Sequence, residues 1–151
     1  MKKFSELKVG EEFHSTCSIS KKELEEYLNF SRVKNVLLDD PTKKSNLVSG
    51  RAILSRMEGE FTRLSQIYGN LLIYVGSDGD VDWNNRSTRF VKPLIVDEVL
   101  KIKFTVSAKE DVDEEYGKIA IDYEGTKQND DLVVVSKKNW YRIKKESLGN
   151  Q

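Results

Sequence analysis

The feature that most constrains this chain is an apolar stripe in its middle that repeats every three or four positions. The stripe consists of Ile53, Met57, Phe61, Leu64 and Tyr68. Such spacing places side chains on one face of a helix. Gly69 follows directly and can adopt the left-handed conformation that ends a helix. We therefore predict one amphipathic helix from about Ala52 to Tyr68, about 25 Å long at 1.5 Å per residue.

Beyond this helix the apolar period changes from helical spacing to two. Alternating segments lie at Leu71–Val75, Ile102–Val106, Ile119–Tyr123 and Leu132–Ile143. Alternation is typical of antiparallel strands that bury one face. The polar stretches Asp111–Gly117 and Gly125–Asp131 are predicted connections. The pattern indicates an α+β fold in which an antiparallel sheet wraps around one long central helix.

The region before the long helix adds a strand and a shorter helix. Residues 11–19 are predicted to form the strand. Ser20 and Glu23 have the spacing of a capping box, so a helix is expected to begin directly after Ser20. The segment Ser31–Asn46 is expected to be irregular because it carries turn-forming residues such as Asp40-Pro41.

Size and composition predict a single domain over residues 1–151. Cys17 is the only cysteine, and no apolar run has the length of a signal peptide or a membrane span. We therefore expect a cytoplasmic protein with no membrane contact. The chain has 25 basic and 25 acidic residues, and this balance argues against general nucleic-acid binding.

Common catalytic and metal sites find little support in the sequence. His14 is the only histidine, so a zinc site or a Ser-His-Asp triad would have to use it. A single histidine in an alternating strand is more often a surface or packing residue. Cys17 lies three residues from His14, which places the two side chains on opposite faces of a strand. The acidic stretch from Asp78 to Asn84 lacks the glycine and the glutamate that a calcium loop requires. No metal is predicted.

Four short motifs are notable for their order and spacing. One is Val9-Gly10 before Phe13, and another is Val48-Ser49-Gly50 at the start of the long helix. A third is Phe90 followed by Pro93-Leu94 and Asp97-Glu98, and the most informative is residues 33–41, with Asn35, Leu37, Asp40 and Pro41. Together these motifs resemble the MaoC-like family of hot-dog proteins, whose Gly-Asp pair is replaced here by Asp97-Glu98. In the family's frame the catalytic Asp falls on Val33 and the catalytic His on Leu38.

The resemblance implies a hot-dog fold and an acyl-thioester ligand, carried on coenzyme A or on acyl carrier protein, with no other cofactor. The implied ligand-binding residues are Asn35, Ser49, Gly50, Arg51 and Phe90. Arg51 lies where it can meet a phosphate or carboxylate, although a solvent-facing arginine fits equally well. The family also implies a dimer with the binding groove between subunits. That dimer is either a homodimer or a heterodimer with a catalytic hot-dog subunit.

Three hypotheses for function follow from the replaced dyad. Removing one general acid–base group costs about 10²–10⁴-fold in rate, so the chain is expected to bind thioesters without the standard dehydratase reaction. Alternatively, it is an active hydratase, dehydratase or thioesterase that uses Asp39, Asp40 or Glu98, although Asp40-Pro41 can simply shape a turn. The third hypothesis is a structural or regulatory module whose groove is closed by residues such as Val33 and Leu38.

Overall fold

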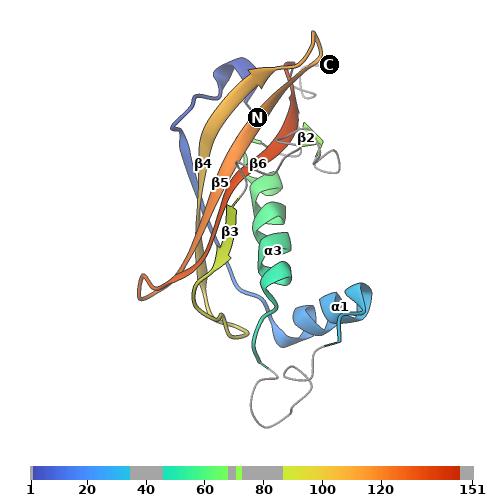
Figure 1. Cartoon of the computed structure of the whole chain (residues 1–151), viewed down its shortest axis with the longest axis vertical. Coiled ribbons are helices and arrows are strands. Elements are labelled where there is room, and N and C mark those ends of the chain that lie inside the picture. The colour runs from blue at the N-terminus through green and yellow to red at the C-terminus, as the bar shows by residue number, and fades with distance from the viewer. Residues whose placement is uncertain (1, 35–45, 68–70, 73–86, 147–151) are drawn as a thin grey trace.

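The computed structural model describes residues 2–34, 46–67, 71–72 and 87–146 (Figure 1). The chain forms, in order, a 3₁₀ turn η1 (Phe4–Glu6), β1 (Glu12–Cys17), α1 (Lys21–Ser31), α3 (Gly50–Arg63), β2 (Leu71–Leu72), β3 (Ser87–Phe90), β4 (Leu100–Asp111), β5 (Tyr116–Lys127) and β6 (Leu132–Lys144). No helix in this part of the chain is long and apolar enough to span a membrane.

The strands form one antiparallel six-stranded sheet. The order is β1-β4-β5-β6-β2, and β3 also pairs with β6. The three long strands β4, β5 and β6 run alongside α3 (Figure 1). The predicted α+β arrangement, an antiparallel sheet against one long helix, is therefore confirmed.

The core lies between α3 and the sheet. Met57 and Phe61 of α3 are fully buried. The Phe61 ring lies 5.4 Å from the rings of both Phe104 and Tyr141. Alternate residues of β4 and β5 point inward as predicted, and these buried residues are Ile102, Phe104, Val106, Ile119, Ile121 and Tyr123. The apolar stripe of the helix and the alternation of the strands thus face each other.

The predicted start of α1 is confirmed. Ser20 Oγ accepts a hydrogen bond from the Glu23 amide at 3.1 Å, and Glu23 Oε1 accepts one from the Ser20 amide at 3.1 Å. Upstream, Gly10 has φ of 93°, a conformation that favours glycine. Its amide donates to the Val106 carbonyl at 2.7 Å, which fixes the entry to β1.

The predicted boundaries of the long helix are wrong by a few residues. α3 begins at Gly50 and ends at Arg63, and Leu64 has extended backbone angles of −56° and 138°. Leaving the helix there carries Ile67 into the core, where it is fully buried. The predicted terminal residues Tyr68 and Gly69 lie outside the described residues.

One predicted connection is also wrong in part. Residues 125–127 belong to β5 rather than to a turn. Gly125 is buried between strands, and a Cβ added to it would lie 3.1 Å from both Leu100 and Val134. Gly125 is therefore required for close packing of the strands. The turn comes later in the chain, at Asp130, which has φ of 67°. The other predicted connection is nearly right, because β4 ends at Asp111 and β5 begins at Tyr116. Of the predicted strand 71–75, the structure describes only Leu71–Leu72.

Candidate functional site

The N-terminus of α3 is held against the segment that follows β3. The Val48 amide donates to the Leu94 carbonyl at 2.8 Å, and Leu47 and Ile95 form an isolated β-bridge. The Val91 amide donates to the Val133 carbonyl of β6 at 2.8 Å. These backbone bonds bring two segments that are far apart in sequence to one place, beside the first turn of the helix.

A pocket of about 550 Å³ opens between these two segments. Its lining residues are Val48, Ser49, Gly50, Arg51, Ile53, Phe90, Val91, Lys92, Pro93 and Leu94. The structure therefore brings together four of the five residues that the sequence analysis proposed for ligand binding. The fifth, Asn35, lies outside the described residues.

The first turn of α3 faces this pocket without a side-chain cap. Ser49 occupies the N-cap position with extended backbone, but its hydroxyl makes no capping hydrogen bond. The first amides of a helix have no intrahelical acceptor and carry the positive end of the helix dipole. This end of α3 can therefore donate hydrogen bonds to a carbonyl or anionic oxygen.

Phe90 forms an apolar wall directly beside that turn. A Cβ added to Gly50 would lie 2.7 Å from Cζ of the Phe90 ring, so only glycine allows this approach. The Phe90 side chain remains 49% exposed. The Phe90 ring therefore packs directly against the backbone of the helix start, because Gly50 has no side chain.

The described lining of the pocket carries positive charge. Arg51 is exposed and has no hydrogen-bond or ion-pair partner among the described residues. Lys92 forms an ion pair with Asp131 at 3.1 Å, and this bond contributes to the lowered pKa of the Asp131 carboxyl. No Asp, Glu or His occurs among the lining residues that the structure describes. Lys92 was missed by the sequence analysis, since an isolated lysine in a loop has no diagnostic pattern.

The remaining predicted site residues lie elsewhere or outside the described chain. Val33 follows α1 and is 49% exposed, and it does not line the pocket. Leu38, Asp39 and Asp40 lie outside the described residues. Glu98 Oε1 accepts from the Ile95 amide at 2.7 Å and from Lys127 Nζ at 3.1 Å. Glu98 therefore closes a turn and pairs with a lysine instead of facing the pocket.

His14 and Cys17 do not form a catalytic pair. His14 is exposed, as expected for a surface residue, whereas Cys17 packs against the core. Burial, with a smaller contribution from nearby Glu60, raises the pKa of the Cys17 thiol to about 11. A thiol in this environment is a poor nucleophile near neutral pH. Within the described part of the chain, no group of three His, Cys, Asp or Glu side chains is arranged to hold a metal ion.

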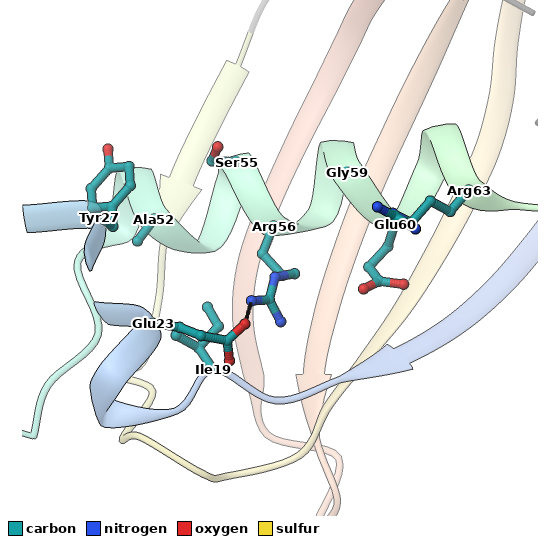
Figure 2. A pocket seen from close by; sticks show the side chains of 9 residues that line it. All are labelled: Ile19, Glu23, Tyr27, Ala52, Ser55, Arg56, Gly59, Glu60 and Arg63. Atoms are coloured by element: carbon teal, nitrogen blue, oxygen red, sulfur yellow. Dashed lines mark hydrogen bonds and ion pairs between the residues drawn. The ribbon is translucent and has the colours of Figure 1, made fainter. Parts of the chain in front are cut away.

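A second cavity, of about 390 Å³, lies between α1 and α3 (Figure 2). Arg56 extends from α3, forms an ion pair with Glu23 and donates to the Ser18 carbonyl at 2.8 Å. Ser15 Oγ donates to Glu60 at 3.3 Å. The sequence gave no sign of this cavity. The contacts attach α1 and β1 to the central helix.

Comparisons with known proteins identify the fold. No family model matches the sequence, and no curated protein sequence matches it. An R-hydratase from Pseudomonas aeruginosa, in its unliganded form, superposes with a TM-score of 0.69 at 15% identity, over 96% of this chain and 86% of that one. A MaoC-like dehydratase from Rhodospirillum rubrum gives 0.65 at 12% identity, over 95% and 97% of the two chains. The protein has a hot-dog fold.

A third hot-dog structure carries a ligand. It is a hypothetical thioesterase from Streptococcus pneumoniae, solved with coenzyme A, with a TM-score of 0.53 at 14% identity over 94% of this chain and 86% of that one. At these identities the likeness concerns the fold alone. The predicted hot-dog fold, shared with MaoC-like dehydratases and R-hydratases, is thus confirmed.

Proposed function

We propose that this hot-dog protein binds acyl thioesters of coenzyme A or acyl carrier protein in the pocket at the start of α3, without the standard dehydratase reaction. The observation that supports this most is the composition of the pocket. Among the described residues, a helix N-terminus that Ser49 does not cap, an aromatic wall and two cationic side chains line it, and no carboxylate or imidazole does.

The N-terminus of α3 would bind the thioester carbonyl. Amides of the first turn, from Gly50 onward, donate to the carbonyl oxygen, and the helix dipole favours its partial negative charge. Phe90 and Val91 offer apolar contact to the acyl part, since both line the same pocket and are about half exposed. A polar contact for the carbonyl and an apolar contact for the acyl chain are therefore both present at the start of α3.

The cationic residues Arg51 and Lys92 would bind the phosphate of the group that carries the acyl chain. Coenzyme A and the prosthetic group of acyl carrier protein both bear phosphate, which arginine binds with two parallel hydrogen bonds. Arg51 has no partner among the described residues, so binding phosphate breaks no bond within that part of the chain. Lys92 would share its charge between the ligand and Asp131. The pneumococcal thioesterase solved with coenzyme A supports this class of ligand for the fold.

The proposed absence of dehydratase chemistry follows from the residues at the family's catalytic positions. Addition of water to a conjugated thioester needs a base for the water and an acid for the carbon. Val33 and Leu38 supply neither. We therefore place this chain as a binding subunit in a hot-dog dimer whose catalytic groups come from a paralogous partner.

Thermal unfolding with and without ligand tests the binding. The probes are coenzyme A, butyryl-CoA and octanoyl-CoA, and a ligand at 100 times its Kd adds about 2.7 kcal/mol to folding stability. We expect a rise in Tm with the acyl-CoAs that exceeds the rise with coenzyme A. Arg51→Gln should reduce the shift, whereas Arg63→Gln, an exposed arginine at the other end of α3, should retain it.

Turnover of crotonyl-CoA by the purified chain separates binding from catalysis. We expect no hydration above background. Hydration that is lost in Asp40→Asn would contradict the proposal and identify an active enzyme with a relocated carboxylate. No Tm shift with any thioester would favour a module with a closed groove.

A further inference from the structure

The contact between Gly50 and Phe90 has a consequence for which acyl groups the pocket admits. Three ring atoms of Phe90, Cζ, Cε1 and Cε2, lie 2.7, 2.8 and 3.0 Å from the position that a Cβ on Gly50 would occupy. The ring therefore stands where a side chain of the helix's first residue would be. It contacts the same turn whose amides the Ser49 side chain leaves uncapped.

The backbone that carries this ring is fixed. Phe90 is the last residue of β3 and pairs with Val134 of β6. The next residue, Val91, is hydrogen-bonded to Val133 at 2.8 Å. Figure 1 shows β3 ending beside the start of α3. The ring can rotate about its side-chain bonds, but its Cα cannot move away from the helix without breaking the β3–β6 pairing.

A thioester bound at the helix end places its second carbon next to this wall. Carbon 2 is bonded to the carbonyl carbon, so it lies within about one van der Waals contact distance, roughly 4 Å, of groups that touch the carbonyl oxygen. A linear chain can pass along the face of the ring. A methyl branch at carbon 2 would widen the chain beside the ring, which cannot move further toward Gly50 to make room.

We infer that Phe90 is a specificity-determining residue that selects acyl groups without a branch at carbon 2, and that it does so because residue 50 is glycine. The inference rests on the proposed function. It names the substrate class of that site as straight-chain thioesters. Phe90 acts here by shape alone and supplies no acid, base or nucleophile.

Paired affinities for two isomeric ligands test this. Butyryl-CoA and isobutyryl-CoA have the same number of acyl carbons and differ in the branch at carbon 2. Because one misplaced methyl group is worth about tenfold or more in a shaped apolar pocket, we expect at least that preference for butyryl-CoA. Isothermal titration calorimetry of the full chain gives both dissociation constants.

Two variants and one control attribute the preference to the ring. Phe90→Ala should reduce the preference to within about twofold, chiefly by strengthening isobutyryl-CoA binding. Gly50→Ala should push the ring toward the pocket and weaken both ligands. Phe30→Ala removes an equally aromatic side chain that is 88% exposed at the end of α1, and it should leave the preference unchanged.

The outcomes separate the two proposals. Equal binding of both ligands by the unmodified chain, or a preference that survives Phe90→Ala, overturns the role of Phe90 and leaves thioester binding intact. Binding of neither ligand by any variant overturns the proposed function and this inference together. Each variant's circular dichroism and Tm are measured first, and since Phe90 is half exposed, its truncation should leave the chain folded.

Discussion

The two ends of α3 are built for different tasks. At its C-terminal half, Met57 and Phe61 are fully buried, and the Phe61 ring contacts the rings of Phe104 and Tyr141. At its N-terminal end, Arg51 is exposed and Gly50 carries no side chain, so that the half-exposed Phe90 ring fills the gap. One helix therefore has a closed end that stabilises the fold and an open end that is available to a ligand.

The closed end also contains polar groups, and these are satisfied internally. Tyr141 Oη donates to Glu58 Oε2 at 2.8 Å, and the hydroxyls of Tyr123 and Tyr141 are hydrogen-bonded to each other. Burial is the main cause that raises the pKa of both phenols, so both stay protonated. At the open end, by contrast, the Ser49 side chain does not cap the helix amides. The two ends of α3 therefore differ in the hydrogen bonding of their polar groups as well as in the burial of their side chains.

The largest expected effect is loss of the ring at the closed end. Phe61→Ala should lower the free energy of unfolding by about 3–5 kcal/mol, because it removes a fully buried ring and leaves a cavity. The matched change at the open end, Phe90→Ala, should cost only about 1 kcal/mol, since half of that ring is already in water. Urea unfolding followed by circular dichroism measures both. Equal costs would show that the two ends do not differ as described.

The next largest effects concern the hydrogen bonds that link Tyr123, Tyr141 and Glu58 at the closed end. Tyr141→Phe should cost about 2 kcal/mol, because it removes the acceptor of Tyr123 and the donor to Glu58. Tyr123→Phe should cost about 1 kcal/mol, since Tyr141 keeps its bond to Glu58. The double variant should cost less than the sum, because the two hydroxyls share a bond. Strict additivity in urea unfolding would rule out the chain of bonds.

The closed end was the more predictable from sequence, for a physical reason. Burial imposes a period on apolar residues, so Ile53, Met57 and Phe61 indicate a helix face, and β4 and β5 alternate clearly. The same signal failed at the helix boundary. Leu64 continues the spacing of the stripe, and nothing in the local sequence shows that the helix ends before it. Gly125 misled in a similar way, because a glycine required for packing resembles one required for a turn.

The open end has no such periodicity. Ser49, Gly50, Arg51 and Phe90 were proposed from short motifs through a family resemblance, and the structure shows that they line one pocket. That Gly50 makes room for Phe90 cannot be derived from spacing, since the two are forty residues apart. Lys92 was missed altogether. Residues that come together only in the tertiary structure can be predicted only from coordinates or from a known motif.

A third prediction asks whether the closed environment extends to β1. The pKa of the Cys17 thiol is raised from 9.0 to about 11, so the native chain at pH 8 should react with iodoacetamide at least about tenfold more slowly than the urea-unfolded chain. Between pH 9 and 11 the unfolded thiol loses its proton before the folded one does, so this group's contribution to stability falls as pH rises. Alkylation at the same rate in both states would place Cys17 in an open environment.

The smallest effect compares the two glycines of α3. A Cβ added to Gly59 meets no atom within 4 Å, so Gly59→Ala should stabilise the chain by about 0.5–1 kcal/mol through lower unfolded-state entropy and better helix propensity. Gly50→Ala gains the same propensity but must displace the Phe90 ring, so it should be neutral or destabilising. In a Phe90→Ala background that obstacle is gone, and Gly50→Ala should then stabilise the chain as Gly59→Ala does. A Gly50→Ala cost that persists without the ring would mean that the backbone at the helix start, and not the contact with Phe90, requires glycine there.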